Sequence, residues 1–164
     1  MKALLLLNDQ LNRRYGALKS ATPQSHQILF IESERMLTTR SWHIQRLFFL
    51  ISARDHFLQE LRDEGFIVTF IRSSDTEAGL KEFQSSHPDV EIEVTEPSSH
   101  RQLEQMKKAG LTLIPNDFFL TPRPLFAQWA SSQKSLVMEN FYRAQRIRLN
   151  ILVEGEKPVG GEWN

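Results

Sequence analysis

Short apolar runs alternate with helical patterns along the first two thirds of the chain. The run 3–7 is apolar at every position, and further strand-like runs follow at 27–31, 66–71, 90–95 and 111–114. Helical patterns cover the residues between them, at 42–64, 76–86 and 99–109. Strands that are apolar throughout are typical of parallel sheets, because both faces of such a sheet are covered. The alternation therefore predicts an α/β fold.

The order of these elements predicts a Rossmann-like, doubly wound sheet. Right-handed crossovers place helices on both faces of a parallel five-stranded sheet, and the strand order 3-2-1-4-5 is the natural solution. We expect strand one at the centre, because it is the most uniformly apolar strand. Ligands bind to such sheets at the carboxyl ends of the strands, where the winding reverses. Here that point lies between the ends of strands one and four.

Polar side chains follow the strands at this edge of the predicted sheet. Asp9, Gln10 and Leu11 follow strand one, Glu32 follows strand two, and Glu96 follows strand four. We expect these residues to line a ligand crevice. The alternative is that they cap turns and helices. None of them is assigned a catalytic role.

The loop after strand one lacks the glycines of a phosphate-binding loop. Its first glycine is Gly16, so both the dinucleotide fingerprint and the P-loop pattern are absent. This disfavours a conventional NAD enzyme or nucleotide hydrolase. His43 and His56 lie thirteen residues apart on the long helix; His43 has no histidine or carboxylate four residues away, and His56 has only Glu60 at that spacing, which does not make a zinc motif, so we predict no zinc or other metal site.

The long helix is apolar around most of its circumference at 47–51. A helix that is apolar on all sides is typical of a buried position. We therefore expect this segment to lie between the sheet and another layer of structure.

The last third of the chain changes character. Helical patterns at 122–132 and 136–152 follow the sheet, and we expect an α/β domain at 1–132 and, at 133–164, a linker helix with the start of a further helical domain. The second helix places Arg143, Arg146 and Arg148 among aromatic residues, which permits a nucleic-acid surface. We favour an inter-domain linker helix with a partly uncovered apolar side, and we expect Arg146 to matter little for stability. A dimer formed through this side would not be physiological.

Charge and cysteine content narrow the function classes. Lysine plus arginine and aspartate plus glutamate both total 20, so net charge does not favour nucleic acid or membranes. The absence of cysteine excludes disulfides, thiol nucleophiles and iron–sulfur ligation by this chain. The first apolar run is too short for a signal peptide or a membrane span. We expect a soluble cytoplasmic protein.

Four segments together resemble one protein family. They are Asp9-Gln10-Leu11 after a leucine-rich strand, Ser52-Ala53-Arg54-Asp55-His56-Phe57 (Ser-Ala-x-x-His-Phe), the run 134–143 (Lys-Ser-Leu-x-Met-Glu-x-Phe-Tyr-Arg) and the run 158–164 (Pro-Val-Gly-Gly-x-Trp-Asn). These segments occur in the same order as in the bacterial photolyase-related and cryptochrome proteins that carry an iron–sulfur cluster, including six-four photolyases. The resemblance covers the whole chain.

The resemblance implies an amino-terminal antenna domain of a longer protein. In this family a helical domain follows, which binds FAD and holds a four-iron four-sulfur cluster, and light drives electron transfer from the flavin to damaged DNA. We therefore expect a helical partner domain beyond residue 164, DNA as a partner of the full-length protein, and neither catalysis nor bound cofactor in this chain alone.

The family's α/β domain can also hold a lumazine antenna chromophore near the strand ends. Relatives have an acidic residue and a tyrosine after strand two, where this chain has Met36 and Thr39. Glu32 and Glu34 lie nearby and could substitute for them. The expected cofactor-binding set is Asp9, Gln10, Leu11, Glu32, Glu34, Met36 and Glu96.

A function from another class also fits the predicted fold. The fold pattern by itself, without a phosphate loop, is compatible with a stand-alone nucleotide-binding regulatory protein. The reading frame beyond Asn164 separates the two, since a long extension with four cysteines is expected for the photolyase-like protein and a stop codon for the regulator.

Overall fold

The computed structural model describes residues 1–163, which fall into two compact units, Met1–Phe118 and a second unit that begins at Phe119. The division precedes the boundary expected after residue 132. Aromatic contacts explain the difference, because Phe126 and Trp129 pack on Phe141, with ring centroids 5.3 and 4.9 Å apart. Each unit is described by itself below.

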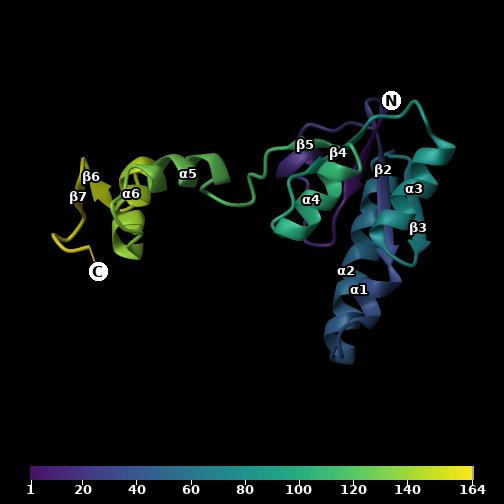
Figure 1. Cartoon of the computed structure of the whole chain (residues 1–164), viewed down its shortest axis with the longest axis horizontal. Helices are drawn as coiled ribbons and strands as arrows, with labels where there is room; N and C mark the ends of the chain where they lie inside the picture. The colour runs from purple at the N-terminus through teal and green to yellow at the C-terminus, as the bar shows by residue number, and fades with distance from the viewer. Residues whose placement is uncertain (164) are drawn as a thin grey trace. The chain divides into compact units, whose positions relative to one another are not determined.

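Five parallel strands form the sheet of the N-terminal unit (Figure 1). They are β1 (Lys2–Leu6), β2 (His26–Ser33), β3 (Val68–Ser73), β4 (Ile92–Thr95) and β5 (Thr112–Ile114). Their order is β3-β2-β1-β4-β5, and Leu5 of β1 is paired with Leu29 of β2 and Val94 of β4. The predicted Rossmann-like sheet and its strand order are confirmed.

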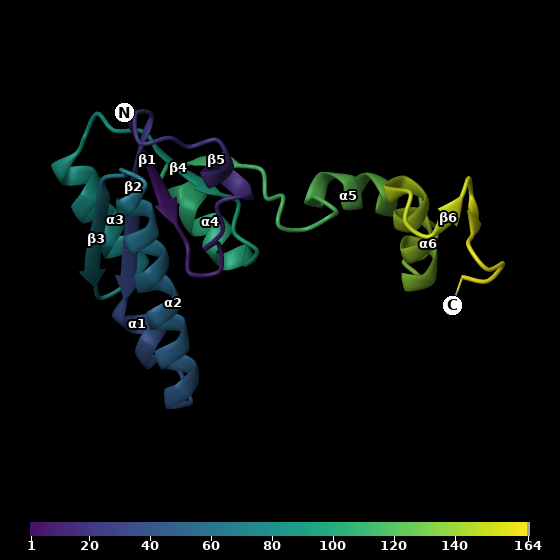
Figure 2. The same ribbon diagram turned by 180° about the vertical axis from the view of Figure 1, so that it is seen from behind.

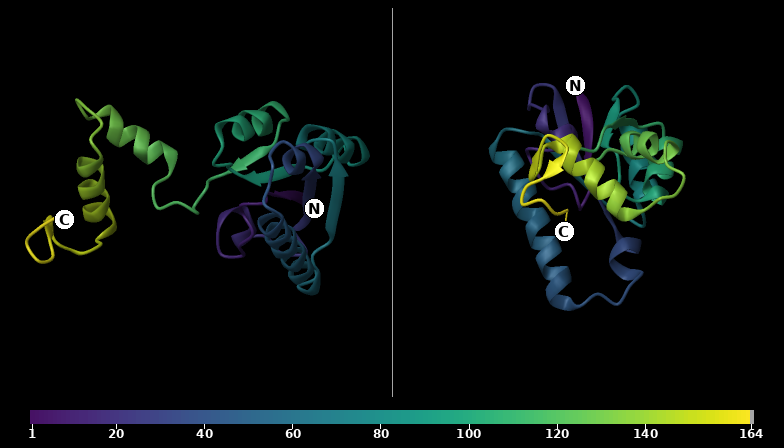
Figure 3. Two further views of the ribbon diagram at one scale, coloured as in Figure 1. Left: turned by 90° about the horizontal axis from the view of Figure 1, so that it is seen from below. Right: turned by 90° about the vertical axis from the view of Figure 1, so that its left-hand side faces the viewer.

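Helices cover both faces of this sheet, as predicted (Figure 3). The helices of this unit are the 3-10 helix η1 (Gly16–Lys19), α1 (Glu34–Thr38), α2 (Ile44–Asp63), α3 (Thr76–Ser86) and α4 (His100–Lys108). Because side chains alternate across a strand, Leu4 faces Leu58 of α2, while Leu5 faces Phe83 of α3 and Met106 of α4. Two apolar cores result, one on each side of the sheet.

Helix α2 differs from the sequence expectation in its first half. Its later turns bury Leu58 and Leu61 against the sheet. Its first turns extend past the carboxyl ends of the strands, together with α1 (Figure 2). There Ile44, Phe48 and Phe49 are 73%, 71% and 69% exposed. The prediction that this segment is buried is therefore wrong for the described structure, because α2 is longer than the sheet that it covers.

The C-terminal unit contains two helices and a short hairpin. These are α5 (Arg123–Ser131), α6 (Met138–Leu149), and the antiparallel strands β6 (Val153–Glu154) and β7 (Lys157–Pro158). Helix α6 ends before the predicted residue 152, because Asn150 takes a left-handed conformation with φ of 53°. Asparagine tolerates that conformation better than most residues, so it is suited to end a helix.

Candidate functional site

The ends of β1 and β4 meet at the centre of the sheet, where the winding reverses. Gln10 follows β1 and is buried, and its Nε2 donates a hydrogen bond to the carbonyl oxygen of Thr95 at 3.1 Å. The structure thus brings together the two strand ends that the sequence predicted to meet. The Gln10 amide links the two strand ends, so its Nε2 is engaged within the protein.

A tight contact holds the loop after β1 against the same point. The backbone N–H of Ala17 donates to Thr95 Oγ1 at 2.8 Å. Gly16 has φ of 62°, and a Cβ atom there would lie 2.3 Å from Thr95 Oγ1. A side chain at this position would clash and would also strain the backbone. Gly16 therefore permits close packing of this loop at the carboxyl edge.

The other predicted residues at β1 and β4 differ in exposure. Asp9 is exposed directly after β1, whereas Leu11 is half-buried and packs on the core beneath α2. Glu96 is half-buried, and its backbone is held by bonds to Ile114 and Asn116. Asp9 is thus the carboxylate of this group that solvent and a ligand can reach most easily.

The segment after β2 brings Met36 to the end of β1. Ser33 Oγ accepts a hydrogen bond from the Met36 N–H at 3.2 Å and so begins α1. Asn8 Nδ2 lies 3.6 Å from Met36 Sδ, and Trp42 Nε1 donates to the Met36 carbonyl at 3.2 Å. Glu34, on the same short helix, is exposed. Asn8 and Trp42, which were absent from the predicted set, therefore border this part of the edge.

Glu32 belongs to a buried charge network rather than to an open crevice. Its Oε2 accepts a hydrogen bond from Arg54 of α2, and its Oε1 accepts one from Arg72 of β3 at 2.6 Å. The Arg54 guanidinium also lies 5.0 Å from the centre of the Phe70 ring and bonds to Asp55. Both carboxylate oxygens of Glu32 are thus engaged, and the network joins α2 to the ends of β2 and β3.

Competing effects act on the pKa of Glu32. Burial raises this pKa, but hydrogen bonds and positive charge from Arg54 and Arg72 prevail and hold it below its ordinary value of 4.5. A carboxyl group with a lowered pKa in the folded state stabilises the fold fully above its ordinary pKa. That contribution is lost as the pH falls through the lowered pKa.

Arg54 was missed as an important residue, although its position carried a signal. It lies four residues before Leu58 and seven before Leu61, and all three are buried. This spacing places them on one stripe of the helix. A charged residue on an apolar stripe predicts a buried partner of opposite charge, and Glu32 is that partner.

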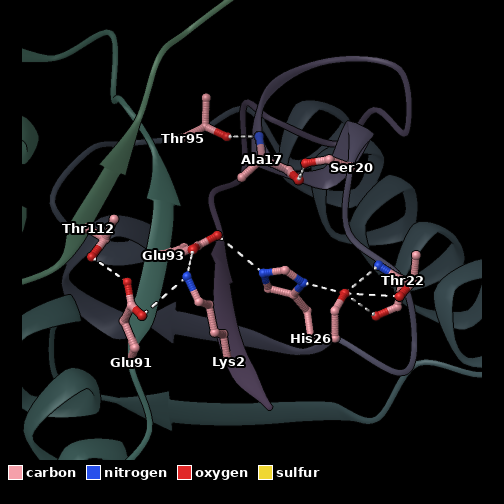
Figure 4. Close-up of polar contacts among 10 residues, drawn as sticks. Lys2, Ala17, Ser20, Thr22, His26, Glu91, Glu93, Thr95 and Thr112 are labelled. Atoms are coloured by element: carbon pink, nitrogen blue, oxygen red, sulfur yellow. Dashed lines mark hydrogen bonds and ion pairs between the residues drawn. The ribbon is translucent and has the colours of Figure 1, made fainter.

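A second polar cluster joins four strands at the amino-terminal edge of the sheet (Figure 4). Lys2 Nζ donates to Glu93 Oε1 at 2.5 Å and lies 3.2 Å from Glu91 Oε2, and these bonds raise the pKa of Lys2. Thr112 donates to Glu91 at 2.8 Å, and His26 Nε2 lies 3.2 Å from Glu93 Oε2. The cluster ties β1, β2, β4 and β5 together at the edge opposite to the candidate site.

Part of this cluster resembles a catalytic triad, in which a nucleophile, a base and an orienting carboxylate are linked in a row: Ser25, His26 and Glu93. Ser25 Oγ lies 2.8 Å from His26 Nδ1. However, the same oxygen accepts a bond from the Thr22 N–H at 3.1 Å and lies 3.1 Å from the Thr22 carbonyl. Ser25 therefore acts as a turn residue, and we assign this set a structural role.

In the C-terminal unit, Arg146 is buried rather than exposed. Its guanidinium donates to the carbonyl oxygens of Ile151, Leu152 and Trp163 and to the Tyr142 hydroxyl. It also lies 5.2 Å from the centre of a Trp163 ring. This buried network argues against the expectation that Arg146 matters little for stability, because one side chain joins α6 to the segments that flank the hairpin.

The C-terminal unit also has exposed apolar side chains. Met138 is 75% exposed, and Leu136 and Leu152 are also exposed. The predicted uncovered apolar side is thus present in the unit, with Met138 as its most exposed side chain on α6. What covers it in a longer protein stays a prediction.

Two further properties of residues 1–163 bear on the candidate site. No group of three or more histidine, aspartate or glutamate side chains in this range is arranged to hold a metal ion. None of the helices in the same range has the length and apolar character needed to cross a membrane.

Comparison with known proteins covers nearly the whole chain. A family model described as deoxyribodipyrimidine photo-lyase-related protein matches residues 4–164. A (6-4) photolyase from Agrobacterium fabrum (strain C58) is 35% identical over an alignment of 173 positions, which includes 98% of this chain and 34% of that protein. The chain thus spans about a third of the length of this curated relative.

Proposed function

Because this chain belongs to the deoxyribodipyrimidine photo-lyase-related protein family, we propose that it is the N-terminal antenna and scaffold domain of a flavin-dependent DNA photolyase or a related cryptochrome. The observation that carries the proposal is the family match over residues 4–164, within a relative about three times as long. In the full-length protein, light would drive repair of pyrimidine lesions or light signalling. The lesion-bearing DNA would bind through the remainder of the protein.

The catalytic cofactors of such a protein belong to the remainder of the polypeptide. The chain contains no cysteine, so it supplies no thiolate ligand to an iron–sulfur cluster. Its first loop has no glycine-rich phosphate-binding sequence. We propose, from the family membership, that a helical domain following this chain holds both FAD and the four-iron four-sulfur cluster and that the full-length protein is cytoplasmic.

Flavin content tests this assignment. The full-length protein is expected to release stoichiometric FAD on denaturation, whereas the chain 1–164 purified in the same way is expected to release little, because the cofactor's site lies elsewhere. Absorbance of the protein-free supernatant measures both. Stoichiometric FAD from the chain 1–164, or none from the full-length protein, would contradict the proposal.

The carboxyl edge of the sheet is the proposed binding site of a lumazine antenna chromophore. Asp9 and Glu34 offer exposed carboxylates that can accept hydrogen bonds from the hydroxyl groups of a ribityl chain. Met36 contributes a polarisable thioether close to Asn8. Gln10 and Glu32 support this edge through their bonds to Thr95 and Arg54, and Leu11 and Glu96 form its flanks.

Lumazine binding to the chain 1–164 tests this site. Asp9→Asn is expected to weaken binding by about tenfold, since a hydrogen bond to a charged acceptor contributes roughly 1.5–3 kcal/mol. Fluorescence anisotropy of 6,7-dimethyl-8-ribityllumazine measures the affinity. The matched control is Asp89→Asn, an exposed aspartate that precedes β4 at the opposite edge. Equal effects of the two substitutions, or ligand located at the amino-terminal edge in a crystal, would contradict the assignment.

A further inference from the structure

The first half of α2 carries an apolar surface with no covering layer in the described unit. We call Ile44, Phe48, Phe49 and Leu50 the α2 patch; these side chains are 73%, 71%, 69% and 38% exposed. Taking about 200 Å² for a whole phenylalanine side chain, the two phenylalanines alone expose roughly 280 Å². The largest apolar patch on a typical monomeric protein covers roughly 300–600 Å² and is often functional, and the α2 patch approaches that size.

The geometry of the patch favours a large, enveloping partner. Ile44 and Phe48 lie one turn apart on the helix, whereas Phe49 and Leu50 point to other sides of it. These turns extend beyond the ends of the strands (Figures 1 and 3). A helix that is apolar on all sides needs cover on all sides. A groove between helices supplies such cover, whereas a flat contact with a second copy covers one side.

Charge in the segment that leads into the patch also disfavours a second copy of the chain. Between residues 34 and 50 there are three arginines, Arg35, Arg40 and Arg46, and one acidic residue, Glu34. The Arg46 guanidinium lies over the Trp42 ring, 5.0 Å from its centre, at the start of α2. Pairing two such surfaces would bring like charges together, which is unfavourable at an interface. A partner with an acidic rim around an apolar groove is complementary.

We propose that the α2 patch inserts into an apolar, acid-rimmed groove on the remainder of the same polypeptide, beyond residue 164. This inference rests on the proposed function, because about two thirds of the relative's length lies outside the region that matches this chain. It assigns the docking of the antenna unit to the start of α2. The carboxyl edge next to α1 then lies beside the interface, which places the proposed chromophore site near the domain that holds the flavin.

Oxidative footprinting by hydroxyl radicals tests this docking by comparing the full-length protein with the chain 1–164. Phe48 and Phe49 are expected to react readily in the chain 1–164 and about tenfold more slowly in the full-length protein, because the core of an interface excludes water. Ile67 is the internal control: it is 57% exposed and lies just before β3, at the opposite edge of the sheet. Its reactivity is expected to be the same in both proteins.

Substitutions in the full-length protein provide a second readout. Phe48→Ser with Phe49→Ser is expected to speed proteolytic release of the N-terminal units by about tenfold, since loss of packing increases local opening. The matched control Ile67→Ser removes an exposed apolar side chain elsewhere and is expected to leave the rate unchanged. Circular dichroism of the variant chains 1–164 checks that both fold.

Several outcomes would overturn the proposal. Equal reactivity of Phe48 and Phe49 in both proteins would show that the remainder leaves the patch uncovered. Protection already present in the chain 1–164 would assign the patch to its own C-terminal unit or, if sedimentation shows a dimer, to a second copy. Binding of the full-length protein to anionic vesicles that is lost with Phe48→Ser would assign it to a lipid surface. FAD content reports separately on the proposed function, so a flavin-loaded protein with an exposed patch contradicts the docking alone.

Discussion

Replacing Arg54 with alanine is expected to lower the free energy of unfolding of the N-terminal unit by about 3 kcal/mol. The substitution removes one of the two bonds to the buried Glu32 carboxylate and the contact with the Phe70 ring. Arg72 still reaches Glu32 at 2.6 Å, so the expected loss is at the lower end of that for breaking a buried ion pair. Urea unfolding of the chain 1–164, followed by far-UV circular dichroism, measures the change.

Exposure distinguishes this arginine from its neighbour in the network. The Arg72 side chain is 68% exposed, so Arg72→Ala is expected to cost less than about 1 kcal/mol. Because the pKa of Glu32 is lowered in the folded state, the difference between wild type and Arg54→Ala should shrink as the pH falls through that lowered pKa. Equal losses for the two variants at neutral pH, or a difference that grows in acid, would argue against a buried ion pair.

Replacing Arg146 with alanine is expected to abolish cooperative folding of the C-terminal unit. Its guanidinium donates hydrogen bonds to the carbonyl oxygens of Ile151, Leu152 and Trp163. Leaving these acceptors without a donor is expected to cost roughly 3 kcal/mol. The core of so small a unit rarely supplies more than about 3–5 kcal/mol, so the substitution removes most of its stability. Exchange of the Val159 amide, which donates to Leu152 in the hairpin, measures the effect.

Arg143 provides the control for this prediction. It is exposed, and its guanidinium lies 5.8 Å from the centre of a Trp163 ring without a buried network around it. Arg143→Ala is expected to cost less than about 1 kcal/mol. Slow exchange of the Val159 amide in Arg146→Ala, equal to that in Arg143→Ala, would contradict the structural role of Arg146.

The sequence predicted where the candidate residues lie along the sheet edge, but it did not predict their exposure or their hydrogen bonds. The topology of the sheet places Asp9, Gln10 and Glu96 at one edge, since each follows a strand that ends there. Whether each side chain is available to a ligand depends on its contacts. Gln10 is bonded to Thr95 and Glu32 to Arg54, whereas Asp9 is exposed. Those differences arise between segments far apart in the chain.

The fold class followed from the sequence because the signals that specify it are local. Runs of apolar residues as long as a strand, separated by helical patterns of sufficient length, leave few topologies for a parallel sheet. The strand order, the central position of β1 and the helices on both faces were predicted on that basis and are present in the structure. The four family-like segments are equally a property of the sequence, and the family match over residues 4–164 confirmed the resemblance.

Tertiary structure decided which polar and apolar side chains are covered. The helical spacing places Arg54 on a buried stripe, but only the tertiary structure supplies its partner Glu32. Arg146 is buried where a set of carbonyl oxygens completes its hydrogen bonds, which its local sequence does not indicate. Phe48 and Phe49 look like core residues, yet they are exposed because α2 extends past the strands. Burial depends on which distant segments meet and where the sheet ends, and a local pattern of residues does not contain that information.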